Sequence, residues 1–178
     1  QICVLFDSIM RGYPINTFMF WEIKNEEIKI GYKFYEFLKF FCQRFNEENP
    51  HVTTTASFKD FFAVIDGQQR LTSLYLGLCS TYAYKQPRVW WPSTRDDSIL
   101  PPRKLYLDLK HRMKTEDDDA LMSYNFKFLT QDQYDKESAA GPENPHHWFC
   151  MHDVLNLPSR KGADDILFEV VIPELEKR

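Results

Sequence analysis

The sequence predicts an α+β domain in which helices pack against a small mixed sheet. The chain has 178 residues, 43% of them hydrophobic and 27% charged, which suits one domain with a single core. Aromatic residues make up 16% of the chain, so an aromatic-rich core is expected. Along the chain, apolar spacing changes in the order helix, strand, helix, strand, helix, strand, strand, which is typical of a mixed α and β architecture.

The first helix is indicated by apolar residues at helical spacing near the start of the chain. Gly12 predicts where this helix ends, and Pro14 prevents its continuation. Residues 17–23 are apolar, aromatic and few, and predict a strand. Apolar side chains recur at helical spacing over residues 34–45, with charged side chains between them, and predict a second helix. The polar stretch 46–59 predicts a loop. The apolar positions of the first helix are Ile2, Leu5, Phe6 and Ile9.

A buried strand is predicted over residues 61–65, followed by a break at Asp66 and Gly67. The next helix carries an apolar stripe from Leu71 to Tyr82. Residues 85–103 contain several prolines and are expected to be largely irregular.

Two more strands are predicted over residues 105–109 and 124–129, separated by an acidic turn at 116–119. The polar stretch 131–145 predicts a loop. Two short helices are predicted near the end, over residues 151–155 and 164–175.

The strongest candidate for a functional site lies where the strand ending at Ile65 meets the following helix. The main-chain N–H groups at a helix start attract anions. Gly67 has no Cβ, so it permits a sharp turn and the close approach of a ligand. Arg70 supplies a planar, permanently charged fork that suits phosphate oxygens. The residue types therefore fit a phosphate site, although the chain lacks the G-x-x-x-x-G-K-[ST] pattern of a P-loop.

The neighbouring polar residues could complete such a site. Gln68 and Gln69 offer amide donors and acceptors, and Asp66 could hold a metal ion or orient a water molecule. A purely structural interpretation is also open, because aspartate commonly caps helices and a surface arginine commonly pairs with a carboxylate.

A family resemblance rests on the segment Val64-Ile65-Asp66-Gly67-Gln68-Gln69-Arg70-Leu71-Thr72-Ser73-Leu74. Upstream, residues 7–15 form a second motif that ends in Gly-Tyr-Pro-Ile, and Phe-Met-Phe-Trp follows at 18–21. Together these segments resemble the N-terminal domain family of GmrSD-type restriction endonucleases. Further similar segments lie at residues 104–109, 126–130 and 148–149.

The resemblance implies a fold like that of ParB and sulfiredoxin, in which a Gly-x-x-Arg turn after a strand holds nucleotide phosphates. It implies binding of a nucleoside triphosphate (NTP) with Mg²⁺, and NTP hydrolysis that regulates the cleavage of modified phage DNA. By position, it assigns catalytic roles to Asp66, Gln68, Gln69 and Arg70, with Asp66 also as the metal ligand. It assigns nucleotide contacts to Gly67, Thr72, Ser8, Arg11 and Gly12.

The nuclease activity of that family belongs to a separate His-Asn-His-type domain, and no such pattern occurs in this sequence. We therefore expect residues 1–178 to form a single nucleotide-binding domain of a longer protein, with a C-terminal or partner nuclease domain and only indirect contact with DNA. The alternative is a non-catalytic module that senses a nucleotide or DNA, or that docks a partner nuclease.

Charge and cysteine content limit the other function classes. The net charge of −4 disfavours a stand-alone nucleic-acid binder, because such binding depends on Lys and Arg at phosphates. The four scattered cysteines predict free thiols and a cytoplasmic protein. The sequence contains neither an apolar run long enough for a membrane span nor a signal-peptide pattern.

Two other groups of residues could carry function. The pattern His146-His147-x-x-Cys150-x-His152 could bind a metal, although it is more simply a loop packed on the core. Trp90 and Trp91, with Arg88 and Arg95, could stack on bases, but a proline-rich loop pinned to the core by its tryptophans is favoured. A surface role is favoured for His111 and Arg112.

Overall fold

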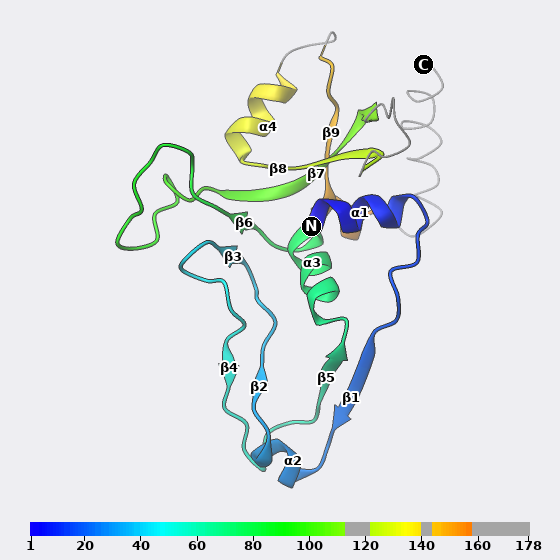
Figure 1. Cartoon of the computed structure of the whole chain (residues 1–178), viewed down its shortest axis with the longest axis vertical. Helices are drawn as coiled ribbons and strands as arrows, with labels where there is room; N and C mark the ends of the chain where they lie inside the picture. The colour runs from blue at the N-terminus through cyan, green and yellow to red at the C-terminus, as the bar shows by residue number, and fades with distance from the viewer. Residues whose placement is uncertain (113–121, 140–143, 158–178) are drawn as a thin grey trace.

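The computed structural model describes residues 1–112, 122–139 and 144–157, and it confirms the predicted α+β class (Figure 1). The elements in chain order are α1 (Ile2–Met10), β1 (Met19–Ile23), α2 (Glu26–Gly31), β2 (Phe34–Tyr35), β3 (Phe41–Cys42), β4 (His51–Val52), β5 (Phe61–Asp66), α3 (Gln68–Leu78), β6 (Tyr82–Ala83), β7 (Pro102–Arg112), β8 (Tyr124–Leu129), α4 (Gln131–Ser138), β9 (Trp148–Cys150) and the 3₁₀ helix η1 (Met151–Asn156).

The strands form one larger sheet and two small ribbons. The five-stranded sheet has the order β3-β6-β7-β8, with β9 also paired to β7. It is mixed, because β3 and β6 run parallel whereas the other pairs are antiparallel. In the described residues, β1 pairs with β5 and β2 with β4, each as a separate antiparallel ribbon. The predicted small mixed sheet is therefore confirmed, and the likeness to ParB and sulfiredoxin stays a prediction.

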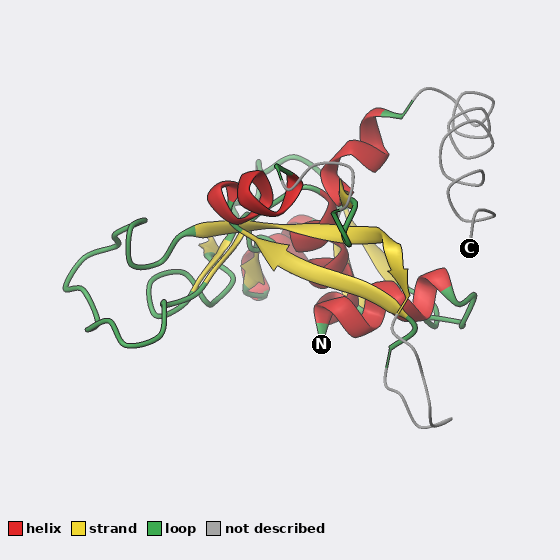
Figure 2. Ribbon diagram, turned by 90° about the horizontal axis from the view of Figure 1, so that it is seen from above, coloured by secondary structure: helices red, strands yellow, loops and turns green. Residues whose placement is uncertain are grey.

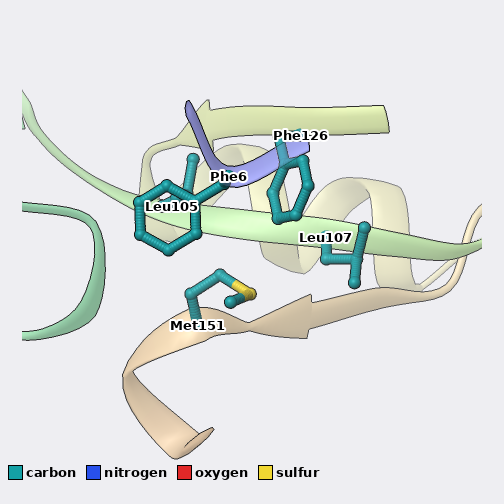
Figure 3. Packing of buried hydrophobic residues seen from close by; sticks show 5 residues of the cluster. All are labelled: Phe6, Leu105, Leu107, Phe126 and Met151. Atoms are coloured by element: carbon teal, nitrogen blue, oxygen red, sulfur yellow. The ribbon is translucent and has the colours of Figure 1, made fainter. Parts of the chain in front are cut away.

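Strand β7 organises the core because its side chains alternate between two covered faces. Leu105 and Leu107 point to one face, where they pack with Phe6 of α1, Phe126 and Met151 (Figure 3). The other face buries Tyr106 with Leu129 and Trp148, and the ring of Tyr106 stacks on Tyr134 of α4 at 4.8 Å between centroids. Helices consequently lie on both sides of the sheet (Figure 2).

Helix α1 ends as predicted. Gly12 has φ +74°, its N–H donates to the Ile9 carbonyl, and the N–H of Tyr13 donates to the Ser8 carbonyl. This is the Schellman arrangement, which uses a left-handed glycine to satisfy the last carbonyls of a helix.

The helix predicted over residues 34–45 is wrong: this segment contains β2 and β3 instead. Its aromatic side chains find partners that are distant in sequence. Phe34 lies edge-on to Phe61 at 4.8 Å between centroids, and Phe41 stacks on Tyr82 at 4.3 Å. Aromatic rings favour a pleated surface, so tertiary contacts override the helical spacing.

Two helices occur where the sequence analysis predicted no helix. Helix α2 begins after Asn25, whose side chain accepts hydrogen bonds from the N–H groups of Glu27 and Ile28. Helix α4 occupies the predicted loop 131–145, and Thr130 and Gln133 form a capping box at its start. The predicted loop 46–59 also contains the short strand β4.

Most other boundaries shift by a few residues. Helix α3 begins at Gln68 and ends at Leu78, so Tyr82 belongs to β6 rather than to the helix. Strand β7 extends beyond the predicted range 105–109, and the helix at 151–155 is confirmed as a 3₁₀ helix. The acidic turn 116–119 and the helix predicted over 164–175 lie outside the described residues.

Among the described residues, no helix is both long and apolar enough to cross a membrane.

Candidate functional site

The turn between β5 and α3 is built around a left-handed glycine. Strand β5 ends at Asp66, and Gly67 takes φ +83° and ψ +12° as the residue that precedes α3 (Figure 1). A Cβ on Gly67 would lie 2.6 Å from Phe18 Cδ1 and 3.2 Å from Arg70 Nη2. Glycine is therefore required here both by the backbone angle and by the space.

The start of α3 has the properties of an anion site. Gly67 is the N-cap residue, and no side-chain hydrogen bond caps the helix in the described structure. The N–H groups of the first turn are the ones that lack partners within a helix, and they lie at the positive end of the helix dipole. The predicted strand–turn–helix arrangement is thus present at residues 61–78.

Arg70 connects this turn to a segment much earlier in the chain. Its Nη1 donates to the Ile15 carbonyl, and its guanidinium lies 5.2 Å from the centroid of the Phe18 ring. Its Nη2 donates to Asp66 Oδ2 at 3.0 Å. With 24% of the side chain exposed, the guanidinium is held in place yet reachable, and it has more N–H donors than these contacts occupy.

The side chains of the other candidate residues in the turn differ in their exposure and in the hydrogen bonds they make. The Asp66 side chain is 62% exposed, and its described partner is Arg70. Gln68 donates from Nε2 to the Val64 carbonyl at 2.7 Å, whereas Gln69 is exposed and its side chain makes no hydrogen bond within the described residues. The Thr72 hydroxyl donates to the Gln68 carbonyl at 2.9 Å, inside its own helix.

The three candidates at the end of α1 have local structural roles. Ser8 Oγ donates to the Val4 carbonyl at 2.9 Å. Arg11 donates to the hydroxyl of Tyr13 at 2.6 Å and pairs with Asp7 at 3.5 Å, while Gly12 ends the helix. No described hydrogen bond or ion pair joins Ser8, Arg11 or Gly12 to the turn.

Besides the pairing of Met19 with Asp66 in the β1–β5 ribbon, Ile15 and Phe18 link the N-terminal segment to the turn, and the sequence analysis did not assign either to the site. Phe18 belongs to the segment 18–21 on which the family resemblance partly rests. The position of Phe18 shortly after the second motif, residues 7–15, is the sequence signal that could have identified it. The contact through the Ile15 carbonyl had none, because any residue type can supply a main-chain oxygen.

A single carboxylate defines what metal this turn could hold. Asp66 is the acidic residue of the turn, and the described residues contain no group of three or more His, Cys, Asp or Glu side chains suited to a metal ion. Mg²⁺ is commonly bound through one or two carboxylates together with substrate phosphates. The residues therefore fit an ion that arrives with a nucleotide, with phosphate oxygens as its remaining ligands.

The histidine pattern near the end of the described chain has divergent contacts. His146 Nδ1 lies 2.6 Å from Asp108 Oδ2, and His152 Nε2 lies 2.8 Å from the Ser80 carbonyl oxygen. Burial lowers the pKa of His152. Burial alone would raise the pKa of Asp108, but hydrogen bonds from the His147 N–H and the His146 ring outweigh it and lower that pKa. These contacts fit the structural interpretation.

The tryptophan pair divides between two environments. Arg44 Cζ and Lys85 Nζ each lie 5.6 Å from the ring centroid of Trp91. Trp90 is 92% exposed and Trp91 is 40% exposed, so the predicted anchoring in the core is wrong for Trp90 and is not confirmed for Trp91. The main chain at His111 and Arg112 belongs to β7.

Family comparison agrees with the motifs around this turn. The model of the family described as GmrSD restriction endonuclease, N-terminal domain, matches residues 1–168. The chain belongs to this family. The GmrSD N-terminal domain family places the protein in a restriction system, with a nuclease domain as the partner that its description implies. No curated protein matches the chain.

Proposed function

We propose that this domain binds a nucleoside triphosphate through the turn from Asp66 to Arg70, and that nucleotide binding regulates a nuclease of the same restriction system. The observation that carries the proposal is the turn itself. Gly67 is the N-cap residue of α3, no side chain caps this helix in the described structure, and the guanidinium of Arg70 lies directly beside Gly67. Main-chain N–H groups and an arginine fork are the two protein features best suited to phosphate oxygens. The family membership supports the same function.

The ion pair between Asp66 and Arg70 suggests how the site accepts its ligand. In the described structure, each charge is neutralised by the other at 3.0 Å. A phosphate that binds Arg70 takes over the role of the carboxylate, and the exposed Asp66 side chain is free to turn away. Asp66 then becomes available to the Mg²⁺ that accompanies the nucleotide, or to a water molecule that attacks the terminal phosphate.

Hydrolysis is the finer part of the proposal, and the non-catalytic alternative keeps one observation in its favour. Asp66 is the one carboxylate of the turn, so a single group would have to serve both as metal ligand and as base. A phosphate-release assay with each NTP and Mg²⁺ distinguishes the two. Release above the blank supports an NTPase, whereas binding without release identifies a nucleotide-sensing module.

The test of the site compares two arginines with similar surroundings. Arg95 pairs with Asp97 at 3.0 Å and lies 4.8 Å from the Phe40 ring centroid, much as Arg70 pairs with Asp66 and lies near Phe18. Arg70→Ala should weaken NTP affinity by about 1.5–3 kcal/mol, or ten- to a hundredfold, because charge-assisted hydrogen bonds are lost. Arg95→Ala should leave affinity unchanged.

Calorimetric titrations beside melting curves separate binding from folding. Arg70→Ala also loses the hydrogen bond to the Ile15 carbonyl, which should cost about 1–3 kcal/mol of stability. Arg70→Lys should bind weakly, since an ammonium cannot reproduce the two-pronged fork. Asp66→Asn should keep metal-free NTP binding and lose phosphate release. If Arg70→Ala folds and binds NTP as the parent does, the assigned site is wrong.

A further inference from the structure

A cavity of about 680 Å³ lies beside the turn from Asp66 to Arg70, and residues of both β1 and β5 line it. Strand β5 lines it from Phe61 to Ile65, and the segments that contain β2 and β4 supply much of the opposite wall. Gln68, the first residue of α3, also lines the cavity. The space is therefore continuous with the turn, and its volume falls within the 300–1,000 Å³ or so that is usual for small-molecule sites.

Aromatic rings dominate the lining. Phe61 has Phe34 and Phe58 edge-on to it, at 4.8 and 5.8 Å between centroids. Trp21, Tyr35, Phe37 and Phe62 also line the cavity, and Trp21 and Tyr35 are 39% and 58% exposed. A group of partly exposed rings around an open space suits a flat heteroaromatic ring, which can stack on one and contact the edges of others.

Polar groups that could recognise such a ring lie in the same cavity. Asn49 is a lining residue, and its side-chain amide makes no hydrogen bond within the described residues. An amide presents a donor beside an acceptor, which matches the edge of a nucleobase. Strand β5 pairs with β1 alone among the described strands, so its other edge has main-chain groups with no strand partner there.

We propose that this cavity holds the nucleobase of the nucleotide whose phosphates bind at Gly67 and Arg70. The inference rests on the proposed function and adds a second subsite to it. Gln68 belongs both to the turn and to the cavity lining, and strand β5, which lines the cavity, leads directly into the turn. The base stacks among the rings, and Asn49 contacts its polar edge.

Inorganic triphosphate is the probe that separates the two subsites, because it has the phosphates of an NTP without sugar or base. Its affinity for the whole chain is measured by calorimetry with Mg²⁺, beside that of ATP, GTP, CTP and UTP. At least one NTP should bind ten times more tightly than inorganic triphosphate. If neither probe binds, the proposed function fails. If triphosphate binds as tightly as every NTP, the function stands and the base subsite is wrong.

Two neighbouring residues of β1 provide a matched pair of variants. Successive side chains of a strand point to opposite faces, and Trp21 lines the cavity whereas Phe20, 52% exposed, does not. Trp21→Leu should lower NTP affinity at least tenfold and leave triphosphate affinity unchanged, and Phe20→Leu should change neither. Asn49→Ala is a second cavity variant with little effect on packing, and a fivefold or greater loss of NTP affinity alone is expected.

Melting curves confirm that each variant is folded at the titration temperature. The inference is overturned if both cavity variants bind NTP as the parent does. It is also overturned if they lose NTP and triphosphate affinity to the same extent, since that would be a general effect on the turn. Selective loss of NTP affinity in Asn49→Ala supports it even where Trp21→Leu fails to fold.

Discussion

Replacing Gly67 by alanine introduces two separate strains, and a second glycine of the chain allows them to be measured apart. Both Gly67 and Gly12 have positive φ, +83° and +74°. A Cβ on Gly12 would meet nothing within 4 Å, whereas a Cβ on Gly67 would lie 2.6 Å from Phe18 Cδ1. Gly12→Ala thus reports the backbone strain alone, and Gly67→Ala reports that strain together with a steric clash.

The expected magnitudes follow from these contacts. A left-handed alanine costs about 1–2 kcal/mol, which is the loss expected for Gly12→Ala. Forcing extra volume against a packed ring adds about 1–3 kcal/mol, so Gly67→Ala should lose about 2–5 kcal/mol of unfolding free energy. The ring of Phe18 must move to make room, and because the same Cβ would lie 3.2 Å from Arg70 Nη2, the guanidinium should move too. Triphosphate affinity should therefore fall in the folded fraction.

Urea denaturation of the two single variants, of Phe18→Ala and of Phe18→Ala/Gly67→Ala completes the experiment. Once the ring is removed, the cost of Gly67→Ala should drop towards that of Gly12→Ala, with only the 3.2 Å approach to Arg70 Nη2 remaining, which gives a coupling energy of about 1–3 kcal/mol. Equal losses for Gly12→Ala and Gly67→Ala, or a coupling energy near zero, would refute the argument that Phe18 fixes the geometry of the turn.

Three further outcomes follow from the described contacts. Asp7→Ala should cost about 2–5 kcal/mol in chemical denaturation, because its carboxylate accepts two main-chain N–H groups at the start of β8, each at 2.7 Å; a loss under 1 kcal/mol would contradict the role of this bond. Burial favours the neutral form of Asp108, yet its hydrogen bonds prevail and lower its pKa. Its contribution to the free energy of unfolding is therefore complete above the ordinary carboxyl pKa of about 4 and is lost as pH falls through the lower pKa of the folded state. Asp108→Asn should reduce the loss of stability at acid pH, and an unchanged loss would exclude Asp108 as its source. All four cysteines should react with a thiol reagent in denaturant without reductant, and a lower count would indicate a disulfide.

Local patterns predicted the parts of the fold whose cause is local. The end of α1 follows from the backbone freedom of Gly12, and the turn into α3 follows from Gly67 after an apolar strand. The capping box of α4 was also visible as Thr130 followed three residues later by Gln133, so the loop predicted there was an avoidable error. The segment 34–45 was different, since its apolar spacing fits a helix and its strands depend on rings that lie elsewhere in the chain.

The same distinction applies to the candidate site. The turn residues were predictable because they are consecutive and their chemistry is apparent in their types. The partner of Arg70 at Ile15 lies 55 residues earlier, and the contact is made by a main-chain oxygen. The sequence placed Ser8, Arg11 and Gly12 beside the turn by resemblance, whereas the described contacts of these residues belong to the end of α1.

Helix α3 connects two regions that differ in how many helices and strands pack against them. The helix packs on α1, η1 and β7, with Leu74 and Leu78 of its second half against the core, and β7 in turn pairs with β6, β8 and β9. Its first residue continues from β5, whose described pairing is with β1 alone. Such a chain can open in parts, and the β1–β5 ribbon should exchange its amide protons through fluctuations that leave the large sheet closed. A nucleotide bound at the turn would slow amide exchange in the β1–β5 ribbon first. Nucleotide binding would therefore reduce the fluctuations of this part of the domain more than those of the large sheet.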